Sequence, residues 1–132
     1  MKIMLFVFFK TDCKKYDSHG SLASIDSAAK MTFVSDILKV LNYLGHSKHW
    51  IGANDYAIEG QWRWIKTGQA VQYFKWAVDE PNVVGDGPED CATIQNYNGT
   101  YLWNDEDCSK HRYYYICETP YVHVLTILFH QL

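Results

Sequence analysis

Four cysteines in a chain of 132 residues constrain the fold more than any other feature of this sequence. They are Cys13, Cys91, Cys108 and Cys117, and no two of them form a Cys-x-x-Cys pair. This spacing argues against a zinc ribbon or a thioredoxin-type redox centre. An even number of cysteines in a short chain predicts structural disulfides, which persist in oxidising compartments such as the extracellular space. Four cysteines can pair in three ways, and the spacing alone does not choose among them.

The size and charge of the chain bound its class. A length of 132 residues suffices for one domain with its own core, but not for two. The formal net charge of -3 argues against nucleic acid as a partner, because no excess of positive charge is present to neutralise phosphates. The apolar runs 3–9 and 121–132 are both shorter than the ~20 residues that span a bilayer, so we expect no transmembrane segment. The first run resembles the start of a signal peptide, although no small-residue cleavage site follows it.

Hydrophobic periodicity predicts two helices. The first extends over Met4 to His19 and ends before Gly20, and the second extends from Ser27, a suitable N-cap, to Tyr43. Apolar residues of the second helix recur every three or four positions and form one stripe that we expect to be buried, consisting of Ala28, Met31, Val34, Ile37, Leu38 and Leu41.

Four short segments are typical of β-strands. They cover His49–Gly52, Cys91–Gln95, Tyr101–Trp103 and Tyr113–Glu118. The sequence therefore predicts an α+β domain with two helices and a small antiparallel sheet. Between the first two strands, the stretch 54–90 has turns and isolated aromatic residues but no regular pattern. A stretch of that length inside a compact domain is functional or disordered, and its tryptophans and tyrosines argue against disorder.

Carboxylates and side-chain amides cluster in and after this irregular stretch. They belong to three short segments: Glu80-Pro81-Asn82, Glu89-Asp90-Cys91 and Trp103-Asn104-Asp105. Oxygen ligands of these two kinds suit Ca²⁺, which takes ~6–8 oxygens in flexible geometry that loops can supply. We therefore expect a calcium-dependent binding site.

The order of motifs along the chain strongly resembles the C-type lectin domain, in particular the short secreted lectins of invertebrates. The matching segments, from about Cys13 to Glu118, are Leu22-Ala23-Ser24-Ile25, Trp50-Ile51-Gly52, Glu80-Pro81-Asn82, Glu89-Asp90-Cys91, Trp103-Asn104-Asp105 and Tyr115-Ile116-Cys117-Glu118. The resemblance implies a C-type lectin-like fold over 13–118, preceded by an incomplete segment 1–12 (signal-like, or the start of a helix) and followed by an apolar tail 119–132. It also implies disulfides Cys13–Cys117 and Cys91–Cys108.

The resemblance further implies the ligands of two calcium sites. The principal site, at which calcium and sugar share their ligands, would comprise Glu80, Asn82, Glu89, Asn104 and Asp105, with a cis peptide bond before Pro81. An auxiliary site would comprise Asp55, Glu59, Glu89 and Asp90. Val83 stands where that site has a further acidic ligand, and Asp86 is a candidate to replace it.

Two departures from the family concern the ends of the chain. The usual first strand and the tryptophan before Cys13 are missing, and Phe6 occupies the tryptophan position. The tail continues beyond Glu118. Either the chain is truncated at one end and extended at the other, or the apolar tail replaces the missing strand in the sheet.

The expected ligands are glycans with vicinal equatorial hydroxyls, because the Glu-Pro-Asn order resembles that of mannose-type lectins. We also expect secretion, recognition of glycan or microbial surfaces by a homo-oligomer, and glycosylation at the sequon that begins at Asn98, although Asn98-Gly99 is also a hairpin-turn pair. The competing interpretation is a protein-interaction module of the same fold that does not bind sugar.

Other chemistry is disfavoured. Glu80 and Glu89 resemble a glycosidase pair, but bound calcium would keep both ionised, so we expect no catalysis. His46 and His49 have no clear third partner for zinc. We expect all tryptophans to be packing residues: Trp50, Trp62, Trp64, Trp76 and Trp103.

Overall fold

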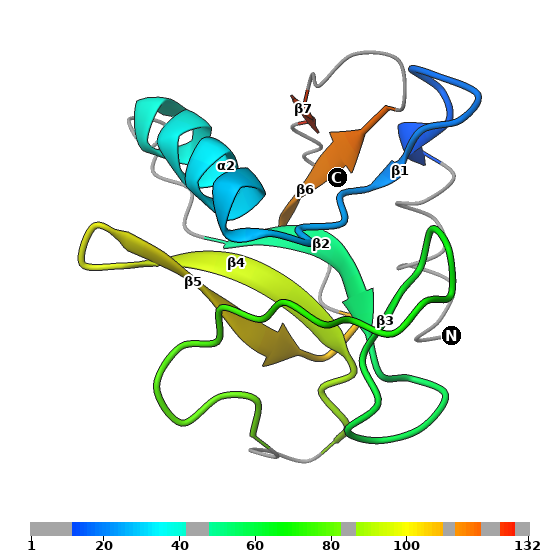
Figure 1. Ribbon diagram of the computed structural model, residues 1–132, viewed down its shortest axis with the longest axis vertical. Coiled ribbons are helices and arrows are strands. Elements are labelled where there is room, and N and C mark those ends of the chain that lie inside the picture. The colour runs from blue at the N-terminus through cyan, green and yellow to red at the C-terminus, as the bar shows by residue number, and fades with distance from the viewer. Residues whose placement is uncertain (1–11, 42–47, 83–86, 110–112, 120–124, 129–132) are drawn as a thin grey trace.

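The computed structural model describes residues 12–41, 48–82, 87–109, 113–119 and 125–128. A single sheet of seven strands has one long helix packed against it (Figure 1). The strands are β1 (Ser21–Leu22), β2 (Lys48–Asn54), β3 (Arg63–Trp64), β4 (Cys91–Tyr97), β5 (Thr100–Glu106), β6 (Tyr114–Glu118) and β7 (Leu125–Leu128), and the helix is α2 (Ala28–Leu41).

The sheet has the order β1-β6-β2-β4-β5, with β3 paired to β2 and β7 paired to β6. Neighbouring strands are antiparallel except for β2 and β6, which run parallel where His49 lies opposite Tyr114. The prediction of an α+β class is confirmed, but a purely antiparallel sheet is wrong at this one pair. The four predicted strands correspond to β2, β4, β5 and β6, each with slightly different ends.

Helix α2 lies close to its predicted position. The backbone N–H of Lys30 donates to Ser27 Oγ at 3.2 Å, so Ser27 caps the helix. Met31, Val34 and Leu38 are its buried residues, whereas Ala28 at the first turn is exposed. The prediction that the helix continues to Tyr43 lies outside the described residues.

The first predicted helix is only partly described. Residues 4–11 and the Phe6 position lie outside the described part of the chain. Asp12 and Cys13 are helical, but 14–16 form a turn, so the helix does not extend to His19. Of the two predicted helices, the structure therefore describes α2 and only the last residues of the first.

Two disulfides join distant parts of the sheet. Cys13 is bonded to Cys117 in β6, and Cys91 at the start of β4 is bonded to Cys108 just beyond β5. These are the pairings that the resemblance implies. The second disulfide closes the end of the β4–β5 hairpin opposite its Asn98-Gly99 turn, at which both residues have positive φ.

Part of the C-terminal tail belongs to the sheet. Strand β7 pairs antiparallel with β6, so that Leu125 lies opposite Glu118 and Leu128 opposite Tyr115. The described part of the tail therefore forms a strand of the sheet. Among the described residues, no helix has the length and hydrophobicity to cross a membrane.

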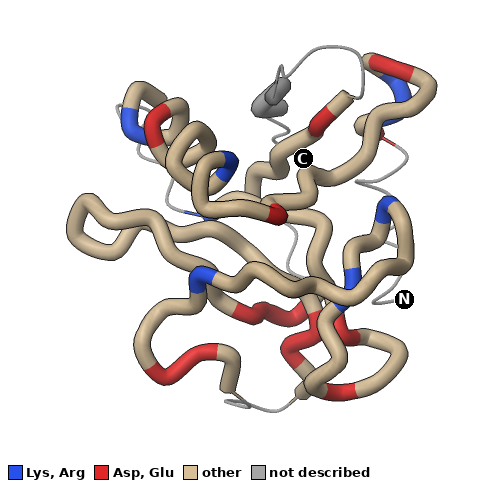
Figure 2. The backbone as a smooth tube through the Cα atoms, viewed as in Figure 1, with Lys and Arg blue, Asp and Glu red and all other residues tan. Residues whose placement is uncertain are grey.

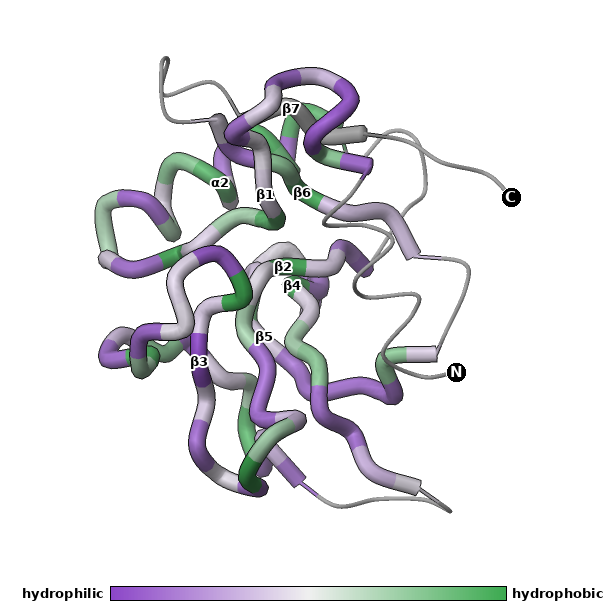
Figure 3. Tube along the Cα trace, turned by 90° about the vertical axis from the view of Figure 1, so that its right-hand side faces the viewer, coloured by the Kyte–Doolittle hydropathy of each residue, from purple (hydrophilic) through white to green (hydrophobic). Residues whose placement is uncertain are grey.

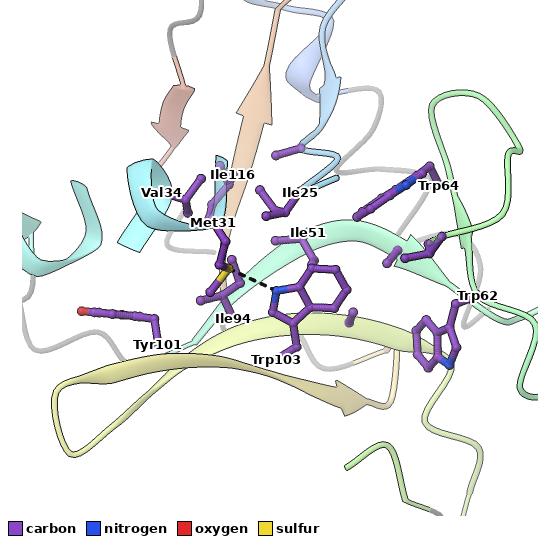
Figure 4. Close-up of a cluster of buried hydrophobic side chains, with 14 of the residues drawn as sticks. Ile25, Met31, Val34, Ile51, Trp62, Trp64, Ile94, Tyr101, Trp103 and Ile116 are labelled. Atoms are coloured by element: carbon purple, nitrogen blue, oxygen red, sulfur yellow. Dashed lines mark hydrogen bonds between the residues drawn. The ribbon is translucent and has the colours of Figure 1, made fainter. Parts of the chain in front are cut away.

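The main core lies between α2, the sheet and the irregular stretch (Figure 4). Trp103 is completely buried at its centre, and its indole N–H points to Met31 Sδ at 3.4 Å. Hydrophobic residues recur along α2 and β6 (Figure 3). Trp50, Trp62 and Trp64 are also buried and Trp76 is partly buried against the cluster, so the prediction that the tryptophans serve packing is confirmed.

Candidate functional site

The irregular stretch is held against β5 by backbone bonds on either side of Trp76. The Trp103 N–H donates to Lys75 O at 2.7 Å, and the Ala77 N–H donates to Trp103 O at 2.8 Å. Trp76 and Trp103 also meet edge-to-face, with ring centroids 5.6 Å apart. The chain then turns, with the Glu80 N–H donating to Ala77 O at 3.1 Å. This anchor brings Glu80-Pro81-Asn82 beside Asn104-Asp105.

Three of the five expected principal ligands are in direct contact. The side-chain amide of Asn82 donates to Glu80 Oε2 at 2.7 Å, and its backbone N–H donates to Asp105 Oδ1 at 3.3 Å. The Glu80–Pro81 peptide bond is cis. Asn104 precedes Asp105 on β5 and its side-chain amide donates to Glu106 Oε1 at 3.2 Å.

Negative charge converges on Glu80. Partial burial, then the hydrogen bond and charge of Asp105, and then the charge of Glu89 raise the pKa of Glu80 to about 7. Carboxylates crowded in this way repel one another, and a bound cation relieves that repulsion. Because the charge of Glu89 acts on Glu80, this fourth expected ligand also lies near the three residues that are in contact.

Asp55, Glu59 and Asp90 form a second acidic cluster, and one ligand oxygen from each lies within 4.8 Å of the others. The β2–β4 pairing explains this, because Asn54 lies opposite Cys91 and the Asp55 N–H donates to Asp90 O at 3.1 Å. Burial, followed by the charges of Glu59 and Asp90, raises the pKa of Asp55 to about 6, although the Gly60 N–H donates to its Oδ2 and opposes the shift.

The two groups lie in one region of the molecule. Asp and Glu residues concentrate at the lower end, around the ends of β4 and β5 and the loops beside them, whereas Lys and Arg lie mainly higher (Figure 2). Val83, which stands at the position of a further auxiliary ligand, and Asp86, the candidate to replace it, lie outside the described residues.

The residues present suit a calcium ion. Asp55 is only 3% exposed, and its Oδ1 has no hydrogen-bond donor in the described structure. A buried carboxylate oxygen without a donor is unfavourable, and a cation would satisfy it. The side chains of both groups supply only carboxylate and amide oxygens as ligands, which Ca²⁺ prefers.

The sequence interpretation missed a buried polar network next to Asn104. Glu106 accepts hydrogen bonds from Lys48 Nζ at 2.5 Å and from Gln95 Nε2 at 3.1 Å. Burial acts to lower the pKa of Lys48, but the hydrogen bond and charge of Glu106 outweigh it, so that pKa is raised. No local pattern connects two residues that lie 58 positions apart in the chain.

Comparison with known proteins shows the same fold and family. A family model for the lectin C-type domain matches residues 7–119. Perlucin from Haliotis laevigata is 33% identical over 117 residues, covering 86% of this chain and 70% of perlucin. Human C-type lectin domain family 17, member A is 41% identical over 106 residues, which cover 80% of this chain. The matched region spans only 24% of that human protein.

Solved structures of C-type lectins support the same family assignment. The C-type lectin CEL-I from Cucumaria echinata superposes with a TM-score of 0.72 at 25% identity, covering 93% of this chain and 84% of CEL-I. The carbohydrate-recognition domain of the mouse scavenger receptor C-type lectin has a TM-score of 0.64 at 31% identity, covering 80% of this chain and 75% of that domain. By its family match, its fold and the order of its motifs, this chain belongs to the C-type lectin domain family.

Proposed function

We propose that this protein binds carbohydrate through a calcium ion held by Glu80, Asn82, Glu89, Asn104 and Asp105. The observation that carries the proposal is the contact of Glu80 and Asn82 with Asp105. Asn82 and Asp105 lie 23 residues apart in the sequence. The raised pKa of Glu80 adds support, because after burial the hydrogen bond and charge of Asp105 and the charge of Glu89 raise it, and a cation would neutralise those charges.

Calcium, when bound, supplies a centre to which two neighbouring sugar hydroxyls can add their oxygen lone pairs. The chain's own residues then complete the hydrogen bonds. Carboxylates such as Glu80 only accept, whereas the amides of Asn82 and Asn104 donate. A hydroxyl can therefore donate to a carboxylate while it accepts from an amide, and bonds to the charged group are the stronger ones.

Mannose-type sugars are the proposed ligand class. The Glu80-Pro81-Asn82 order supports this choice by its resemblance to mannose-type lectins. Among proteins of similar structure, the bovine CD23 carbohydrate-recognition domain, 32% identical with a TM-score of 0.61, was solved in the presence of a GlcNAc2Man3 oligosaccharide. A monosaccharide at one shallow site would bind with roughly millimolar affinity, so recognition of a microbial or cell surface would require a homo-oligomer.

We propose that Asp55, Glu59, Glu89 and Asp90 hold an auxiliary calcium. The buried Asp55 Oδ1 without a donor supports this assignment. The auxiliary ion would also order the irregular stretch, because Asp55 and Asp90 lie at the two ends of it.

The remaining expectations follow from the family and the surface. We propose that the protein is secreted, as its disulfides indicate, and is not an enzyme. Asn98 is exposed at the tip of the β4–β5 hairpin, where a sequon is accessible to glycosylation.

Retention on immobilised mannose tests the proposal. We expect the protein to bind in millimolar calcium and to elute with EDTA or free mannose, and we expect Asp105→Ala to pass through unretained. Asp36→Asn provides a matched control, because Asp36 is an exposed acidic residue on α2. Retention that persists in EDTA, or in Asp105→Ala, would exclude the mechanism, whereas wild-type protein that does not bind mannose in calcium would favour a protein-interaction module.

A further inference from the structure

A buried carboxylate lies directly beside one of the proposed calcium ligands. Glu106, the last residue of β5, is 6% exposed, and its Oε1 accepts three hydrogen bonds. The donors are Lys48 Nζ at 2.5 Å, Gln95 Nε2 at 3.1 Å and Asn104 Nδ2 at 3.2 Å. Because β2, β4 and β5 each contribute to this cluster, it has a defined position relative to the sheet.

The bond from Asn104 determines which end of its amide is directed away from Glu106. The two ends are chemically opposite, since the oxygen accepts hydrogen bonds and the nitrogen donates two. Turning the amide over would place its oxygen against a carboxylate oxygen, where neither atom can donate. Glu106 therefore holds the nitrogen, leaves Oδ1 available to a cation, and uses only one of the two N–H groups. The second N–H remains for a ligand hydroxyl.

Lys48 and Gln95 hold Glu106 in turn. The ammonium of Lys48 donates a charge-assisted hydrogen bond to Glu106 Oε1, which is stronger than a bond between neutral groups. Gln95 is itself fixed, because its Nε2 also donates to Thr93 Oγ1 at 3.1 Å. Tyr113 adds a longer contact from its hydroxyl to Glu106 Oε2 at 3.4 Å.

We propose that Glu106 is a positioning residue of the calcium and sugar site, which acts by orienting the side-chain amide of Asn104. The proposal rests on the proposed function. Groups that orient metal ligands in this way contribute roughly 10–100-fold to metal affinity when they are tested by substitution.

Two substitutions separate orientation from charge. Glu106→Gln removes the charge at nearly constant size, and Glu106→Asp keeps the charge but withdraws the carboxylate by one methylene. We expect both to weaken calcium binding about 10-fold by titration calorimetry. If Glu106→Asp retains wild-type calcium affinity, Glu106 contributes only its charge and the proposal is wrong. Wild-type protein that binds no calcium would instead refute the proposed function.

A control and a second background exclude a general loss of stability. Glu118 is also a largely buried carboxylate, paired with Lys30 and Lys66, so Glu118→Gln should lower stability without changing calcium affinity. Asn104→Asp leaves an oxygen ligand but no amide to orient. In that background, Glu106→Gln should no longer weaken calcium binding; a loss as large as in the wild type would overturn the proposal.

A metal-free readout tests the hydrogen bond itself. In ¹H–¹⁵N NMR spectra of the protein in EDTA, the Asn104 side-chain NH₂ signals are identified by their absence in Asn104→Asp. We expect the proton bonded to Glu106 to resonate downfield and to exchange slowly with solvent, and to lose both properties in Glu106→Asp. An unchanged pair of signals in that variant would show that Glu106 does not hold the amide.

Discussion

The side-chain amide of Asn82 donates a hydrogen bond of 2.7 Å to Glu80 Oε2 across Pro81. Two residues proposed to bind the same ion are therefore complementary to each other, one as donor and the other as acceptor. Glu80→Gln together with Asn82→Asp would exchange the carboxylate and the amide. The donor–acceptor pair and the net ligand charge would be preserved, but the hydrogen bond would run in the opposite direction.

We expect this double variant to keep its calcium affinity within about twofold and to shift from mannose-type to galactose-type sugars. A sugar hydroxyl that meets the reversed pattern leaves a donor or acceptor unpaired, which costs about 1–3 kcal/mol. Competition by mannose and galactose for an immobilised glycan measures the shift. An unaltered mannose preference in a variant that still binds calcium would show that these two residues do not select the sugar.

The two acidic groups predict how the stability of calcium-free protein depends on pH. Folding raises the pKa of Glu80 from 4.5 to about 7 and that of Asp55 from 3.8 to about 6. The folded state thus holds protons more tightly, so these groups favour folding below their ordinary pKa values and lose that contribution as the pH rises through the folded ones. In EDTA, we expect the melting temperature to fall between pH 5 and pH 7.5 by about 3–6 °C on account of these groups.

Calcium should remove this fall in melting temperature, because bound metal stabilises the ionised carboxylates. Melting curves at both pH values, with EDTA and with calcium, test the prediction. Glu80→Gln should show a weaker fall in EDTA, whereas Asp36→Asn on α2 should behave as the wild type. An equal fall in Glu80→Gln and wild-type protein would mean that Glu80 does not contribute.

Glu118 should stabilise the fold as the partner of two lysines. Its electrostatic effect is opposite to that of the two acidic groups, because the ionised form is the one that is favoured. It accepts from Lys30 Nζ at 2.5 Å and Lys66 Nζ at 3.1 Å, which connects β6 with α2 and the irregular stretch. Burial acts to raise the pKa of Glu118, but the two lysines and the Ser24 N–H outweigh it and lower that pKa. The contribution is therefore present above the ordinary carboxyl pKa of 4.5 and is lost as the pH falls through the lowered value.

We expect Glu118→Gln to reduce the free energy of unfolding by about 1–3 kcal/mol at pH 7. Urea unfolding at pH 7 and near pH 3 measures the effect, and the difference between the variant and the wild type should shrink at the lower pH. A constant difference would indicate that the loss comes from packing and not from the ion pairs.

Removal of the two disulfides should have different effects on stability and on calcium affinity. Cys13–Cys117 closes a loop of 104 residues and Cys91–Cys108 one of 17. Chain entropy predicts a loss of about 4–5 kcal/mol on removing the first and about 3 kcal/mol on removing the second. The second bond lies next to Asp90 and near Asp105, so we expect its double Ser variant to weaken calcium binding more, although it costs less stability. Unfolding curves combined with calcium titration distinguish the two effects.

Short-range patterns in the sequence determined the class of the fold and many of its elements. Helix α2 follows from its apolar spacing and from Ser27, because capping and amphipathicity act within a few residues. The strands β2, β4, β5 and β6 follow from their apolar and aromatic runs. The order of motifs identified the family and with it the expected ligand set.

Only the tertiary structure decided how the segments meet. The two-residue strands β1 and β3 are too short to have a periodicity, and the pairing of β7 with β6 depends on the partner edge as much as on the tail. The contact of Asn82 with Asp105 depends on the anchoring of Trp76 against Trp103. The cluster of Lys48, Gln95 and Glu106 could not be predicted, because a polar residue in a strand carries no local sign of its partner. Strand register alone brings such residues together, and register is set by long-range packing of the hydrophobic face.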